Sequence, residues 1–118
     1  MITITFFAKE IEKKDKVNLE TITGFRTKGH AEYAEYGEDI VCAAVSALVM
    51  NTMESIRLLS SDVFDYEEDE EKGISDFRII SDPTSPETKV LFQSLVIGLK
   101  GIQDEYGKKY LRIVFQNS

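Results

Sequence analysis

The chain has 118 residues, a formal net charge of -7 at pH 7, one cysteine and one histidine. This length predicts a single domain over residues 1–118, large enough to bury a core without disulfides or metal. A lone cysteine forms no internal disulfide, no apolar run approaches the roughly 20 residues of a membrane span, and no secretory signal is visible. We therefore expect a cytoplasmic protein with no membrane contact.

The negative charge argues against a protein that binds nucleic acid directly, because such binding needs clustered lysines and arginines. It favours a basic polypeptide partner by long-range attraction. Solubility alone explains the acidity equally well.

The predicted elements follow the order β-β-α-β-α-β. Alternation in residues 2–6 indicates a first strand, and a charged turn at 9–16 leads to a second strand at 19–28, in which Gly24 marks a bulge or a close backbone approach. Apolar residues at helical spacing predict a helix from Asp39, its N-cap, to about residue 60.

The second half of the chain begins with an acidic run at 65–72, which we interpret as a solvated loop rather than a cation site. A third strand is expected at 74–80 and a last strand at 110–115. Between them Ser85 and Pro86 predict a helix start, and Gly107 its end. Its predicted apolar stripe comprises Leu91, Leu95, Leu99, Ile102 and Tyr106. The expected class is α+β: a mainly antiparallel four-stranded sheet with two helices packed on one face, leaving the other face or an edge for self-association.

Candidate chemistry lies at the ends of two predicted elements. His30 follows Gly29 at the end of the second strand, and Cys42 falls in the first predicted turn of the first helix. Free N–H groups and the positive helix end stabilise a thiolate there and can donate to an oxyanion. His30 can then protonate a leaving amine. We expect the segment between them to be a mobile loop, formed by Ala31, Glu32, Tyr33, Ala34, Glu35, Tyr36, Gly37 and Glu38.

Plainer explanations remain open for each residue. Cys42 taken alone is equally well a buried inert thiol. Ser46 either acts near the thiol or is a small residue at a helix contact, and Asp39 either orients His30 or only caps the helix. Zinc is disfavoured, since two or more ligands would have to come from carboxylates, and no cofactor is expected. Candidates for an apolar substrate pocket, each with an ordinary core or loop explanation, are Phe25, Tyr33, Tyr36, Met50 and Met53.

The stretch Gly29-His30-Ala31, the loop ending in Tyr36-Gly37, and Asp39-Ile40-Val41-Cys42-Ala43 followed by Ser46 resembles the Prp family of ribosomal-processing cysteine proteases. The resemblance implies catalytic roles for His30 and Cys42 and supporting roles for Gly29, Asp39 and Ser46. Ala44-Val45 departs from the family, in which many members carry a glycine between the cysteine and the serine.

The resemblance also implies a function. Members of the family are homodimers that remove the N-terminal extension of the twenty-seventh protein of the large ribosomal subunit, cutting after a Phe-Phe-type sequence and before Ala. The chain's own Phe6-Phe7-Ala8 matches that sequence by coincidence in our interpretation. Two rival functions are a non-catalytic chaperone or assembly factor for a ribosomal protein, and a sensor that uses oxidation of Cys42.

Overall fold

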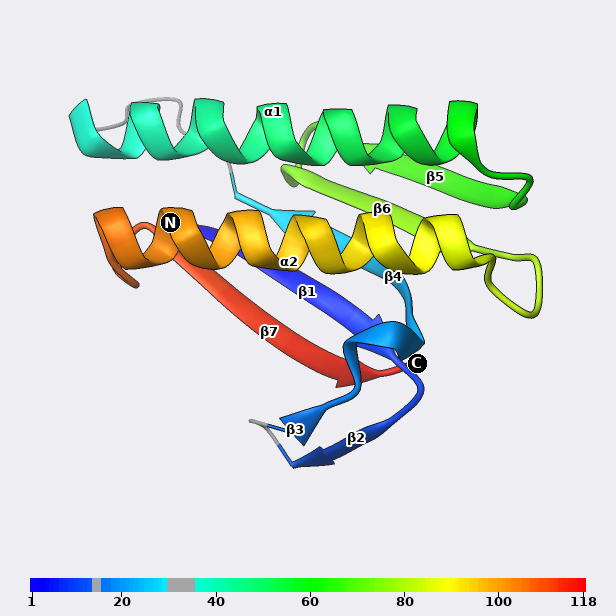
Figure 1. The fold of residues 1–118 in the computed structure, drawn as a ribbon. Helices are drawn as coiled ribbons and strands as arrows, with labels where there is room; N and C mark the ends of the chain where they lie inside the picture. The colour runs from blue at the N-terminus through cyan, green and yellow to red at the C-terminus, as the bar shows by residue number, and fades with distance from the viewer. Residues whose placement is uncertain (14–15, 30–35) are drawn as a thin grey trace.

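The computed structural model describes residues 1–13, 16–29 and 36–118. Two helices lie side by side on one face of a five-stranded sheet, whose strand order is β5-β6-β4-β1-β7 (Figure 1). The sheet consists of β1 (Ile2–Ala8), β4 (Ile22–Lys28), β5 (Phe64–Asp69), β6 (Ile74–Ile79) and β7 (Leu111–Asn117). The helices are α1 (Tyr36–Leu59) and α2 (Pro86–Tyr106). The α+β class is confirmed, with five strands in the sheet instead of four.

The strand β1 lies between an antiparallel and a parallel neighbour. It pairs antiparallel with β4 and parallel with β7, while β4, β6 and β5 are antiparallel in turn. The register shifts opposite Gly24, as a bulge requires, and a Cβ at that glycine would lie 2.4 Å from the carbonyl oxygen of Phe77. Both predicted reasons for Gly24 are therefore confirmed.

Two segments predicted as loops contain strands. The charged turn at 9–16 holds a small ribbon of β2 (Ile11–Lys13) and β3 (Lys16–Val17), followed by a short 3-10 helix, η1 (Leu19–Thr21). The interpretation of the acidic run as a solvated loop is wrong over residues 65–69, which belong to β5 at the edge of the sheet. Charged side chains are compatible with an edge strand because one face and one edge remain in water.

Helix α1 begins at Tyr36, three residues before the predicted N-cap Asp39. Asp39 is therefore inside the first helical turn, and the last three residues of the predicted loop are helical. Acidic residues in a first turn interact favourably with the positive helix end, so Asp39 is compatible with this earlier start. The expectation that Asp39 caps the helix is wrong.

Among the described residues one segment, Asp39–Leu59, is long and apolar enough to cross a membrane by length and composition, contrary to our expectation. In this fold the apolar side chains of the segment pack into the core of the protein. Val41, Val45 and Ile56 are buried between the helix layer and the sheet. We interpret the apolarity of α1 as that of a core helix.

Helix α2 has the predicted ends. The Ser85 side chain accepts a hydrogen bond from the Thr88 N–H, Pro86 is the first residue, and Gly107 caps the end at φ 105°. The buried surface is broader than the predicted stripe because α2 packs against both α1 and the sheet. Phe92 and Val96 are buried, whereas Tyr106 is 41% exposed.

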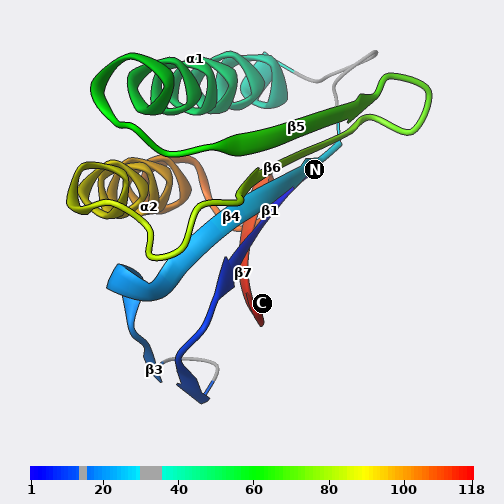
Figure 2. The same cartoon turned by 90° about the vertical axis from the view of Figure 1, so that its right-hand side faces the viewer.

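The buried core residues come from both helices and from the sheet, and neither α1 nor α2 covers the other face of the sheet (Figure 2). Phe25 and Phe77 stack across neighbouring strands at 5.4 Å, and Phe92 of α2 meets both rings edge-on at 6.1 and 6.2 Å. These aromatic contacts fix the helix layer on the sheet.

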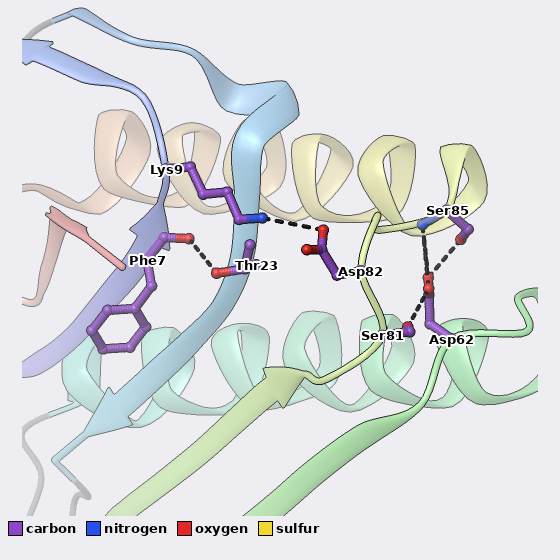
Figure 3. A network of polar contacts seen from close by, with 7 residues as sticks. All are labelled: Phe7, Lys9, Thr23, Asp62, Ser81, Asp82 and Ser85. Carbon is purple, nitrogen blue, oxygen red and sulfur yellow. Dashed lines mark hydrogen bonds and ion pairs between the residues drawn. The ribbon is translucent and has the colours of Figure 1, made fainter.

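A carboxylate ties the connection after α1 to the start of α2 (Figure 3). The Oδ1 of Asp62 accepts a hydrogen bond from the Ser81 hydroxyl at 2.7 Å, and its Oδ2 accepts one from the Ser85 hydroxyl at 2.6 Å. Partial burial acts to raise the pKa of Asp62, but hydrogen bonds from Ser85, Thr88 and Ser81 outweigh it, and the pKa is lowered. Asp62 therefore holds the α2 N-terminus in place as an anion.

Candidate active site

A cavity of about 220 Å³ lies between α1 and the sheet, and Cys42 lines it together with Gly29 and Ser46. These three residues were singled out from the sequence, and they come from the end of β4 and from α1. We name this space the Cys42 cavity.

One face of α1 forms one wall of the cavity. Cys42 and Ser46 are separated by one helical turn, and the apolar side chains that continue the same face are Val45, Val49, Met50 and Met53. Residues at these spacings share a helix face, which explains why one helix supplies so much of the wall. Cys42 is half-buried and is a free thiol.

The earlier helix start changes the environment of Cys42. The N–H groups without an intrahelical partner belong to roughly the first four residues of a helix. Cys42 follows Tyr36 by six positions and lies in the second turn, so the prediction of free N–H groups at the thiol is wrong. The polar side chains that line the Cys42 cavity are instead the hydroxyls of Ser46, Thr27, Ser75 and Tyr66 and the carboxylate of Glu68.

Gly29 occupies a position that demands glycine. Its φ is 111°, and a Cβ there would lie 2.4 Å from the carbonyl oxygen of Met1. Its N–H donates to the carbonyl oxygen of Gly73 at 3.0 Å, which fixes the end of β4 against the turn after β5. The next residue, His30, and the predicted loop residues 31–35 lie outside the described residues.

The sheet forms the opposite wall. Thr27, Ser75 and Glu68 are cross-strand neighbours on β4, β6 and β5, and the hydroxyls of Thr27 and Ser75 are hydrogen-bonded to each other. The Tyr66 hydroxyl donates to Oε2 of Glu68 at 3.4 Å. Burial and then the charge of Glu68 raise the pKa of Tyr66, so this phenol stays protonated at neutral pH.

Of the remaining predicted residues, some line the Cys42 cavity and others lie elsewhere. Met50 and Met53 line the Cys42 cavity, whereas Phe25 belongs to the aromatic core and Asp39 is exposed and absent from the lining. Tyr33 and the side chain of Tyr36 lie outside the described residues. Within the described part of the chain, no group of three or more His, Cys, Asp or Glu residues could hold a metal ion.

The sequence prediction missed the sheet wall, formed by Thr27, Tyr66, Glu68 and Ser75. A signal was present for β5, because Phe64, Tyr66 and Glu68 alternate with Asp65 and Glu67, as expected for a strand with two different faces. The run of acidic residues concealed it.

Comparison with known proteins gives a consistent result. The profile of the family described as "Cysteine protease Prp" matches residues 1–111. The ribosomal processing cysteine protease Prp of Staphylococcus aureus is 32% identical over 87 residues, covering 74% of this chain and 81% of that protein. The protein of the same name from Bacillus subtilis is 30% identical over 95 residues, covering 78% and 84%.

Solved structures resemble the fold over nearly the whole chain. The S. aureus Prp protease in complex with a substrate peptide superposes with a TM-score of 0.79 at 28% identity, covering 98% of this chain and 100% of that one. The same protease with a covalently linked product peptide gives a TM-score of 0.77 at 29% identity, with the same coverage. With a cysteine-lined cavity between helix and sheet, this chain belongs to the Prp family of cysteine proteases.

Proposed function

We propose that this protein is an endopeptidase that removes the N-terminal extension of the twenty-seventh protein of the large ribosomal subunit. The proposed cut follows a Phe-Phe-like sequence and precedes Ala. The observation that carries the proposal is the position of Cys42 in a cavity shared with Gly29 and Ser46. It is supported by the S. aureus relative, which is named a ribosomal processing protease and binds a substrate peptide.

The proposed reaction uses His30 and Cys42 as a dyad. The Sγ of Cys42, as a thiolate, attacks the scissile carbonyl carbon and forms a tetrahedral oxyanion. Collapse of this intermediate breaks the C–N bond and leaves a thioester, while His30 gives a proton to the departing amine. Water then hydrolyses the thioester with His30 as the base. His30 suits this role because it directly follows Gly29, which lines the Cys42 cavity.

The cavity supplies two further functions in this proposal. The Ser46 hydroxyl, one turn from Cys42, is a donor that can stabilise the oxyanion in place of a helix-terminal N–H group. The apolar residues Val45, Val49 and Met53 form a seat for one apolar side chain of the substrate. A volume of about 220 Å³ falls below the roughly 300–1,000 Å³ of pockets for drug-sized ligands, so it suits a side chain of an extended peptide.

Val45 belongs to the Ala44-Val45 pair, which departs from the family because many members carry a glycine between the cysteine and the serine. It is 4% exposed and lines the Cys42 cavity. The valine side chain therefore adds apolar surface to the seat and reduces its size. We propose that Val45 adjusts which apolar side chain is preferred, while the thiol and its partner are unaffected.

The proposal includes a cytoplasmic homodimer acting on a basic substrate. A net charge of -7 attracts a basic ribosomal protein precursor at long range, which accelerates encounter. The segment over residues 31–35, between the end of β4 and the start of α1, is proposed to close over the bound peptide.

The test is cleavage of a peptide that spans the precursor extension, read by mass spectrometry. Wild type should cut the peptide at a single bond and release two fragments. Cys42→Ala and His30→Ala should leave the peptide intact. Ser46→Ala is expected to fold normally and to lower kcat by about tenfold to a hundredfold, which is at or below the effect of removing one donor from an oxyanion hole.

Two outcomes would contradict the proposal in different ways. An intact peptide after incubation with folded wild type would exclude the protease function. Binding and function of Cys42→Ala equal to those of wild type would favour the non-catalytic chaperone or assembly factor.

A further inference from the structure

Strand β5 presents one carboxylate to the Cys42 cavity. Side chains alternate along a strand, and Tyr66 and Glu68 face α1 while Glu67 faces the open side of the sheet. Among the described residues that line the cavity, Glu68 is the one with a formal charge.

Glu68 also lines a second, adjoining cavity of about 250 Å³, formed where β4 ends beside the turn between β5 and β6. The two cavities share Glu68, Gly29, Thr27 and Ser75. Glu68 therefore stands at the boundary between an apolar space beside Cys42 and a space whose charged lining residues, Asp69 and Glu70, are also acidic.

The carboxylate is not neutralised within the described part of the chain. The Tyr66 hydroxyl donates to its Oε2 at 3.4 Å, and among the described residues no lysine or arginine forms a salt bridge with it. Asp76 on the open face is different, since Arg26 donates to it at 2.6 Å and Arg78 at 2.7 Å. Glu68 thus keeps an acceptor directed toward the space that a bound peptide would occupy.

We propose that Glu68 is a specificity-determining residue that pairs with a lysine or arginine of the substrate. The inference rests on the proposed protease function and extends it to the chemistry of a second substrate position. An apolar side chain fills the seat formed by Val45, Val49 and Met53, and a basic residue within about three positions of it along an extended peptide reaches Glu68. Tyr66, protonated at neutral pH, holds the carboxylate in place.

The experiment is a positional scan with two enzymes. Peptides keep Phe-Phe-Ala at a fixed place and carry a single Lys, Gln or Glu at one flanking position at a time. With wild type, kcat/KM at one position should follow Lys over Gln over Glu, with about threefold to tenfold between Lys and Gln. In Glu68→Gln the preference at that position should disappear, and in Glu68→Lys it should reverse.

The matched control is Glu67→Gln, which removes the same charge from the same strand on its opposite face. It should keep the wild-type preference, so a general effect of net charge would show as a change in both variants. Two results would overturn the role of Glu68 and leave the protease function standing. One is a preference for Lys that persists in Glu68→Gln, and the other is a wild type that cuts every peptide without preference. A folded wild type that cuts none of the peptides would overturn the proposed function and this inference with it.

Discussion

Replacing Gly29 with alanine tests how the site is held at the end of β4. The φ of 111° is disfavoured for any residue with a Cβ, which costs about 1–3 kcal/mol. The added Cβ would also lie 2.4 Å from the carbonyl oxygen of Met1, and relieving such an overlap of backbone costs about 1–3 kcal/mol more. Gly29→Ala should therefore lower the free energy of unfolding by about 2–6 kcal/mol.

Two other glycines separate these causes. Gly107 has a similar φ of 105° but no atom within 4 Å of the added Cβ, so Gly107→Ala should show the backbone cost alone. Gly101, inside α2, also has open space at its Cβ, and Gly101→Ala should stabilise the protein by about 0.5–1 kcal/mol. Urea denaturation of the three variants gives the comparison.

The same variant has a catalytic readout. Relief of the overlap shifts the end of β4, which is followed at once by His30, so kcat/KM for peptide cleavage should fall under conditions where Gly29→Ala is folded. Equal destabilisation by Gly29→Ala and Gly107→Ala would refute the argument from the Met1 contact. A Gly29→Ala protein as stable as wild type would refute the argument from φ as well.

Two further predictions concern the scaffold. The pKa of Asp62 is lowered in the folded state. The carboxylate therefore contributes to the free energy of unfolding above its unfolded-state pKa of about 3.9, and this contribution is lost as the pH falls through the folded-state pKa. Asp62→Asn should lower the free energy of unfolding by about 1–3 kcal/mol at pH 7. The difference from wild type should shrink when urea denaturation is repeated near pH 3, and a constant difference at both pH values would contradict the assignment. Phe92→Ala should cost about 3–5 kcal/mol, because Phe92 is 0% exposed. Val90→Ala, on the exposed side of the same helix, should change stability by less than about 0.5 kcal/mol, and similar losses for both would contradict the packing described for α2.

Local sequence signals predicted most of the fold because they arise from local physics. Alternation in β1, the Ser85 cap, Pro86 and Gly107 each report on the conformation of a few neighbouring residues, and the structure confirms them. Gly24 was also informative, since a glycine in a strand indicates a bulge or a close approach.

The errors have physical causes of another kind. Asp39 is a good N-cap residue by type, yet it also suits a first helical turn, and sequence does not separate the two positions. The acidic run hid β5 because its pairing with β6 is a long-range contact that composition does not reveal. Phe92 and Val96 were missed because the predicted stripe assumed one packing partner for α2.

At the candidate site, too, local signals were predictable from the sequence and long-range contacts were not. Cys42, Gly29 and Ser46 were found from their chemistry and their positions at predicted junctions. The wall formed by Thr27, Tyr66, Glu68 and Ser75 was not found, because it comes from three strands that meet only in the folded sheet.

The central claim is that Cys42 is the nucleophile of a peptide-cleaving site. Rapid acid quenching during turnover of the precursor-extension peptide, followed by intact-mass analysis and fragment mapping, tests it most directly. We predict an adduct whose mass is that of the N-terminal fragment less one water, located on Cys42, and absent from both Cys42→Ala and an unreacted control. Cleavage that persists in Cys42→Ala, or an adduct located on another residue, would contradict the account.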